Sequence, residues 1–170
     1  MSYDLHEVCT NFEWKDIEMT TPINHDLMLN PDIPENDLAH RIIGFAIEIH
    51  KALGPGLQKS AYRECLEYEL SNHGLPVEKN KPMPVTYKDL QLDYGYQLDL
   101  LVDQKVVVEV MTCDQISDQD VQRLLRFLKL GDYKLGLIIN FNSNLLKNGI
   151  RRVNNMRNVH ADERMGTLYQ

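Results

Sequence analysis

Two short apolar runs joined by two turn-forming residues most constrain the fold of this chain. The runs cover 96–102 and 105–111, and Asp103 and Gln104 lie between them. Such runs, rich in valine and leucine, are typical of neighbouring antiparallel strands joined by a tight turn. Each run holds one carboxylate, Asp99 in the first and Glu109 directly after three valines in the second, and both are expected at the ends of neighbouring strands. Because hairpin strands lie side by side, the sequence predicts that these two acids come together.

Helical periodicity precedes this hairpin. Apolar residues fall on one helical face from Asp37 onward, with Asn36 or Asp37 as the N-cap and a Gly-Pro-Gly corner at 54–56 as the stop. A second helix is expected from 57 or 58 to a C-terminal glycine at Gly74. The sequence therefore begins its folded part with two helices.

Strand periodicity dominates the rest of the chain. Further strands are predicted at 85–87 and 90–92, as antiparallel neighbours of the central hairpin. A third helix should end near Gly131, and the continuous apolar run 135–139 suits a strand covered on both faces. Residues 150–153 are predicted to form a last short helix or an edge strand. The pattern indicates one α/β domain.

The negative charge is concentrated at the N-terminus. The chain of 170 residues has a net charge of -7, and its first 40 residues hold nine acids and one lysine, which is -8. The remainder therefore carries +1. We divide the chain into an acidic extension at 1–36, a domain at 37–154 and a polar tail at 155–170.

Apolar side chains interrupt the acidic extension. Phe12 and Trp14, with Ile17 and Met19 nearby, are costly to leave in water. They are expected to dock onto the domain or onto a neighbouring chain, and homo-oligomerisation is the first expectation. A terminus without fixed contacts is the alternative.

Several function classes lose support from composition. No stretch approaches the ~20 apolar residues of a transmembrane helix, and the first ten residues lack a secretory signal pattern, so a cytoplasmic protein is expected. The three cysteines lack paired spacing, which argues against a disulfide framework or a zinc site.

Nucleic acid binding gains little support from the near-neutral domain. The basic concentration considered for it comprises Lys147, Arg151, Arg152 and Arg157.

The carboxylate pair suggests metal-dependent phosphodiester hydrolysis. Asp99 and Glu109 can together hold a hard cation such as magnesium. That chemistry also uses a lysine to stabilise developing charge or to help deprotonate a water, commonly two residues after the glutamate. Met111 occupies that position here. Spacing alone leaves open that both acids are ordinary solvated carboxylates.

Several separated segments resemble the GxxExxY protein family, which belongs to the PDDEXK nuclease-like superfamily. The likeness covers roughly 38–154. It implies a restriction-endonuclease-like α/β core, in which helices flank a mixed central sheet and the acids lie at its opening. The segments that carry it are GPGL (54–57) with Tyr62, YQLDLLV (96–102), VVVE (106–109), FLKL (127–130) and GLIINFN (136–142).

The departures from the family pattern fall on the positions expected to be chemical. Lys59 stands where the name-giving motif has its glutamate, and Met111 stands where Glu-x-Lys has its lysine. Arg123 replaces the expected glutamine, and Phe127 replaces the usual tyrosine of the same helix. The resemblance therefore predicts a degenerate active site.

A charge count favours a site without metal. Asp99 and Glu109 with Lys59 and Arg123 sum to zero, so we expect the two cations to form an ion-pair network in place of a metal. No cofactor is then required. The protein is interpreted as a pseudoenzyme that serves as a binding or assembly module.

The rival reading keeps the enzyme. Asp99 and Glu109 still bind magnesium, and Lys59, relocated to a helix, supplies the catalytic lysine of a nuclease. The two readings differ in whether a metal binds.

Overall fold

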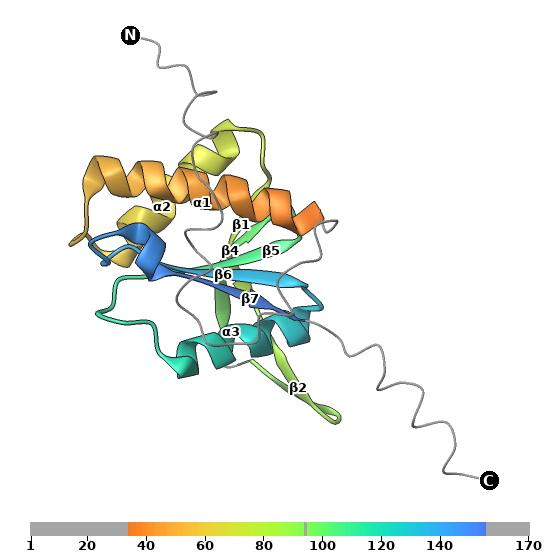
Figure 1. Ribbon diagram of the computed structural model, residues 1–170. Helices are drawn as coiled ribbons and strands as arrows, with labels where there is room; N and C mark the ends of the chain where they lie inside the picture. The colour runs from red at the N-terminus through yellow and green to blue at the C-terminus, as the bar shows by residue number, and fades with distance from the viewer. Residues whose placement is uncertain (1–33, 94, 156–170) are drawn as a thin grey trace.

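The computed structural model describes residues 34–93 and 95–155, which form a helix-flanked sheet and a separate small hairpin (Figure 1). In chain order the elements are α1 (Pro34–Leu53), α2 (Lys59–Asn72), β1 (Val77–Pro82), β2 (Val85–Tyr87), β3 (Leu90–Leu92), β4 (Gln97–Val102), β5 (Val106–Met111), α3 (Asp118–Gly131), β6 (Leu135–Asn140), the 3-10 helix η4 (Leu146–Gly149) and β7 (Ile150–Asn154).

The main sheet is mixed. Its strand order is β1-β4-β5-β6-β7, and every neighbouring pair is antiparallel except β5 and β6. A parallel pair needs a crossover connection, and α3 supplies it between β5 and β6. This arrangement places both strands of the central acidic hairpin inside the sheet, with β4 and β5 each flanked by another strand.

Helices cover both faces of the sheet. Figure 1 shows α1 and α2 on one side and α3 on the other. Two apolar clusters follow from this layering: a larger one beneath α1 and α2, and a smaller one beneath α3. Residues 106–108 and Val110 are buried, as expected for a strand covered on both faces. No helix within the described ranges is both long and apolar enough to cross a bilayer.

The helix boundaries agree with the local signals, with one shift. α1 begins at Pro34, before the predicted cap at Asn36 or Asp37, because proline suits the first turn, where no amide hydrogen is needed. Gly74, at a φ of +74°, follows the end of α2 as predicted. Ser117 caps α3 in a capping box with Asp120, and Gly131 ends that helix.

The strands differ from the prediction in two places. β1 was not predicted, because half of its residues are charged, and it lies at the sheet edge against β4. β2 and β3 were expected to continue the central antiparallel run, but they form their own two-stranded sheet. Of the two options for 150–153, the structure has the edge strand β7.

Candidate functional site

Asp99 and Glu109 lie where β4 and β5 separate. The backbone pairing of these strands runs from Val102↔Val106 to Leu100↔Val108, and the two acids are the next residues on each strand. Beyond this point β4 continues beside β1 and β5 continues beside β6. Asp99 is 7% exposed and Glu109 is 6% exposed, so the opening holds two nearly buried carboxylates.

The alternation of faces along β4 breaks at Asp99. Leu98 packs in the cluster beneath α3, whereas Leu100 packs in the cluster beneath α1 and α2, although strict alternation would give them one face. Glu109 lies between Val107 and Met111, which both pack on the α3 side. The irregularity therefore lets the carboxylate of Asp99 contact α2, while Glu109 remains on the face toward α3.

Asp99 is held by three groups. Its Oδ2 accepts a hydrogen bond of 2.9 Å from the backbone amide of Val110. The same oxygen lies 2.7 Å from the ammonium nitrogen of Lys59, and Oδ1 lies 3.7 Å from Nη1 of Arg63. The hydrogen bond from the Val110 amide replaces a backbone hydrogen bond between the strands at the point where they separate. The two cations offset the buried negative charge.

Glu109 has weaker compensation. Burial, and then the negative charge of Asp99, raise the pKa of Glu109 from 4.5 to about 7, although Lys59 and Arg123 act in the opposite direction. Its Oε1 is buried and accepts no hydrogen bond from the described residues. Near neutral pH this carboxyl is therefore divided between its protonated and ionised forms.

Lys59 and Arg63 reach the site from the start of α2. Gln58 precedes the helix in an extended conformation, so Lys59 is its first residue and Arg63 follows one turn later on the same face. The corner before the helix is fixed by Tyr62, whose hydroxyl donates to the carbonyl of Gly54 at 2.5 Å. The Tyr62 ring also stacks on Phe141, which ties α2 to the end of β6.

Sequence reasoning missed Arg63. Its Nη1 donates to Oδ1 of Asn80 at 2.8 Å, and its Nε is buried without a hydrogen-bond partner in the described part of the chain. The i, i+4 spacing from Lys59 was the signal that could have identified it. Two cations, rather than one, therefore approach Asp99 from α2.

Arg123 does not contact the acidic pair as the predicted ion-pair network required. Its Nη2 lies 3.1 Å from Oδ1 of Asp120, one helical turn earlier on α3. Its charge still lowers the pKa of Glu109, so its influence on the pair is electrostatic. The reason is local: Asp120, fixed by the capping box, offers the guanidinium a nearer carboxylate.

Met111 belongs to the packing of the domain. Its side chain is half-buried against the cluster beneath α3, beside residues that include Val107 and Leu128. A lysine at this position would bring an ammonium group either into the same apolar surroundings or to the opening between the strands. Met111 instead extends the hydrophobic core up to the acidic pair.

The donor set at the opening is small for a divalent cation. Among residues 34–93 and 95–155, no group of three or more His, Cys, Asp or Glu side chains is placed to hold a metal ion. Two carboxylates remain, and both oxygens of Asp99 already face cations. Within the described ranges, Oε1 of Glu109 has no hydrogen-bond partner, and this feature fits a bound cation.

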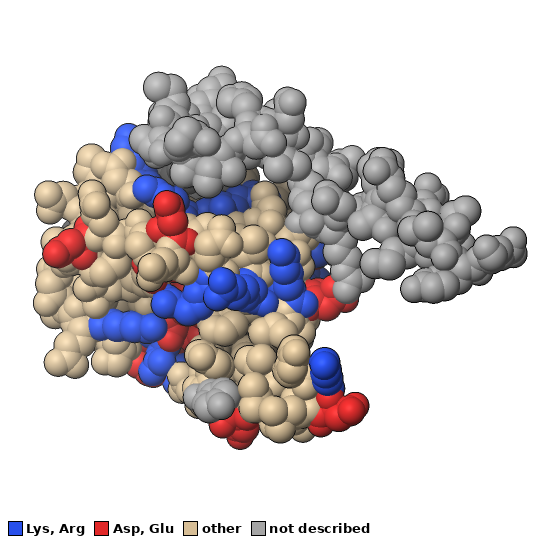
Figure 2. Space-filling view, turned by 90° about the horizontal axis from the view of Figure 1, so that it is seen from below, with Lys and Arg blue, Asp and Glu red and all other residues tan. Residues whose placement is uncertain are grey.

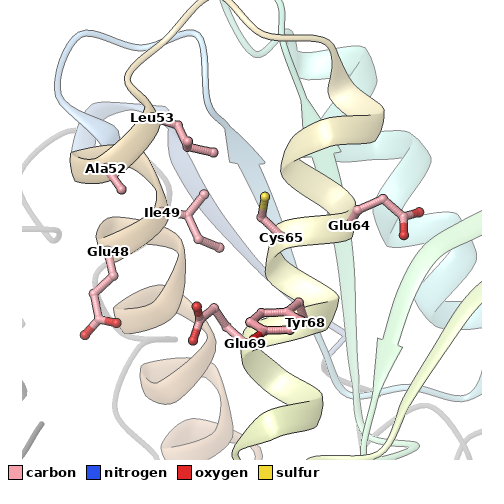
Figure 3. A pocket seen from close by; sticks show the side chains of 8 residues that line it. All are labelled: Glu48, Ile49, Ala52, Leu53, Glu64, Cys65, Tyr68 and Glu69. Atoms are coloured by element: carbon pink, nitrogen blue, oxygen red, sulfur yellow. The ribbon is translucent and has the colours of Figure 1, made fainter. Parts of the chain in front are cut away.

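A separate cavity of about 500 Å³ lies between α1 and α2, away from the acidic pair (Figure 3). Ile49, Leu53 and Cys65 point into the gap between the helices, whereas Glu64 points away from it. Glu64 instead pairs with Lys79 at 3.1 Å. Neither Asp99 nor Glu109 lines this cavity, so it is not part of the candidate site.

Basic side chains gather on the face that carries α3. Figure 2, viewed from that side, shows a band of lysines and arginines across the molecule. Arg123, Arg126 and Lys129 of α3 are exposed, and they were not included in the predicted basic group. Of that group, Arg157 lies outside the described residues.

The domain with this opening matches a known family model. The PD-(D/E)XK nuclease superfamily model covers residues 36–153, most of the chain. The chain therefore belongs to the PD-(D/E)XK nuclease superfamily, as the fold and the acidic pair at the sheet opening also indicate. The finer resemblance to the GxxExxY family stays a prediction. No curated protein and no solved structure matched in the corresponding searches.

Proposed function

We propose that this protein is a catalytically degenerate PDDEXK domain that serves as a binding or assembly module. The observation that carries the proposal is the ion pair of 2.7 Å between Lys59 Nζ and Asp99 Oδ2. An ammonium at that distance occupies the space that a cation bound to Asp99 needs. The side chain of Lys59 is 45% exposed, so its ionised form keeps part of its hydration while it contacts the acid.

Electrostatics support the same conclusion. A divalent cation at Asp99 would meet the charges of Lys59 and Arg63, and like charges within a few ångströms repel strongly in a partly buried site. Burial raises the pKa of Glu109, which weakens it as a second ligand because ligands must be ionised. The site is best described as self-neutralised.

Calorimetric titration with magnesium and with manganese tests this proposal. The expected result is no binding heat beyond dilution for the unmodified chain and for Asp99→Ala alike. Micromolar binding that disappears in Asp99→Ala would contradict it. A thermal unfolding curve of each protein verifies that the variant remains folded.

A second function is favoured by the unpartnered Oε1 of Glu109. In it, Asp99 and Glu109 would hold magnesium, which supplies Lewis acidity toward a phosphodiester, and the exposed Lys59 would orient or deprotonate the attacking water. A nuclease assay on single-stranded DNA, double-stranded DNA and RNA, with magnesium and with manganese, decides between the two functions. Cleavage lost in both Asp99→Ala and Lys59→Ala establishes the enzyme, whereas absence of cleavage on every substrate removes it.

Two features of the amino-acid sequence support the assembly role. The acidic extension and the near-neutral domain are electrostatically distinct, and Phe12 and Trp14 give the extension an apolar contact element. Both residues lie outside the described residues. Light scattering of the full chain and of a Phe12→Ala, Trp14→Ala variant tests the extension: a lower mass in the variant supports its role, and identical masses exclude it.

Nucleic acid remains a secondary partner class. The basic band in Figure 2 supports it, while the charge of +1 over 41–170 limits its strength. Arg126→Ala combined with Lys129→Ala should weaken any such binding, with a reduced salt dependence. Binding that is unchanged in this variant would exclude the α3 face.

A further inference from the structure

The β2–β3 hairpin has one apolar face and one polar face. Val85 pairs with Leu92 and Tyr87 pairs with Leu90, so these four side chains share a face. Thr86 and Gln91 pair on the opposite face. Both residues of the polar face are exposed, which is the ordinary arrangement for a solvated surface. The apolar face is the one that needs a partner.

The outer half of that apolar face is open to solvent. Tyr87 is 64% exposed and Leu90 is 56% exposed, whereas Val85 and Leu92, nearer the domain, are half-buried. Lys88 lies 5.5 Å from the centre of the Tyr87 ring, yet most of the ring surface remains uncovered. An exposed tyrosine and leucine that form a cross-strand pair make a contiguous apolar patch, unlike single surface hydrophobics.

The hairpin also lacks a third strand. In the part of the chain that the structure describes, β2 and β3 pair only with each other, and the hairpin extends past α3 away from the main sheet (Figure 1). A two-stranded sheet is marginally stable in water by itself, and packing of its apolar face against another element stabilises it. Packing of its apolar face against another element would therefore stabilise the hairpin.

We infer that the apolar face of the β2–β3 hairpin is a surface through which two copies of this chain associate. The inference deepens the proposed assembly role and rests on it. Two-fold symmetry places the partner's Leu90 against Tyr87 and the partner's Tyr87 against Leu90, because the two residues are directly opposed across the hairpin. A large aromatic side chain then packs on an aliphatic one at both ends of the contact.

The charge at the hairpin tip suits a second copy. Lys88 and Asp89 form the turn and sum to zero, so a two-fold contact brings each lysine toward the partner's aspartate without net repulsion. The α1–α2 cavity is less suited to self-association, because Glu48 and Glu69 would meet their own copies there. Charge complementarity therefore selects the hairpin.

Sedimentation equilibrium of the full chain over a range of concentrations tests the inference. The unmodified chain should show a monomer–dimer equilibrium. Tyr87→Lys combined with Leu90→Lys should raise the dimer dissociation constant at least about tenfold, since a buried tyrosine is a frequent binding hot spot. The matched control is Thr86→Lys combined with Gln91→Lys, which adds the same charge to the polar face and should leave the dissociation constant within about threefold.

Three outcomes overturn the inference. A purely monomeric unmodified chain removes both the hairpin contact and self-association. A dimer that both lysine pairs weaken equally shows a charge effect without a specific face. A dimer that neither pair weakens, but that the Phe12 and Trp14 substitutions dissociate, removes the hairpin and retains the assembly role. Circular dichroism of each variant confirms that the domain remains folded.

Discussion

The two ends of the central β4–β5 hairpin differ in the interactions that hold the two strands in place. At the closed end, Val102 pairs with Val106 beside a three-residue turn, and apolar packing covers both faces. At the open end, Asp99 and Glu109 part, and a side-chain carboxylate accepts the amide hydrogen of Val110. The closed end gains stability from hydrophobic burial, whereas the open end buries charge at a cost.

That difference places the electrostatic cost of the central hairpin at its open end. A buried carboxylate pair destabilises a domain unless a cation compensates it. Here the compensation comes from the first turn of α2, through Lys59 and Arg63, rather than from α3. At the open end, side chains of the chain itself therefore supply positive charge beside Asp99. Four substitutions measure this contrast.

The largest effect is expected at the closed end. Val108→Asp places an unpaired carboxylate in the fully buried cluster beneath α1 and α2, and should cost more than about 4 kcal/mol of unfolding free energy. Urea denaturation measures it. Thr86→Asp on the exposed face of β2 is the control and should change stability by less than about 0.5 kcal/mol. Equal costs at both positions would contradict the packing contrast.

The next effect depends on pH. Glu109 has a folded pKa of about 7 against 4.5 for an unperturbed glutamate, so between these values the folded state holds a proton that the unfolded state has released. Stability therefore falls as pH rises through this window, by a total on the order of 3 kcal/mol, and levels off above it. Glu109→Gln should remove this slope.

Urea denaturation of Glu109→Gln and of the unmodified chain at about pH 5 and about pH 8 measures the slope. The variant's stability relative to the parent should rise with pH. A relative stability that is constant, or that falls with pH, would show that Glu109 titrates normally. Glu48→Gln on α1 is the matched control and should leave the parent's slope unchanged.

An intermediate effect is expected for Lys59→Ala. Asp99 loses its shortest cationic contact but keeps the amide of Val110 and the more distant Arg63, so the expected cost is about 1–2 kcal/mol at neutral pH. The pKa of Glu109 should rise further, because Lys59 lowers it. Lys51→Ala, an exposed lysine on α1, should leave both quantities unchanged. Carboxyl-carbon NMR follows the titration.

The smallest effect is expected for Arg123→Ala. This guanidinium pairs with Asp120 at the surface, and such pairs contribute about 0–1 kcal/mol. The pKa of Glu109 should rise less than in Lys59→Ala. If Arg123→Ala instead shifted that pKa more than Lys59→Ala did, the assignment of α2 as the source of counter-charge would be wrong.

The sequence predicted the parts of the fold that rest on long periodic signals. The three helices, the β4–β5 hairpin and the buried β6 follow from apolar spacing and from end signals such as Gly74 and Gly131. β1 was missed because an edge strand needs no apolar alternation. The separate pairing of β2 with β3 depends on where the chain turns after them, which local alternation does not encode.

The candidate site was predictable in its acids and less so in its cations. Asp99 and Glu109 follow from hairpin geometry, and the motif comparison identified Lys59. Arg63 was not predicted but lies near Asp99, whereas Arg123 was predicted there but pairs with Asp120. Which cation reaches the acids depends on helix orientation and on competing partners such as Asp120. Side-chain competition of this kind arises only from the three-dimensional arrangement.

Manganese binding to the unmodified chain and to Lys59→Glu, measured by calorimetry, tests the central claim most directly. If Lys59 occupies the place of the metal, the unmodified chain binds no manganese, and Lys59→Glu gains a third carboxylate and measurable affinity that Asp99→Ala abolishes. Equal manganese affinity in the unmodified chain and in Lys59→Glu would contradict the account, since the lysine would then not exclude a cation.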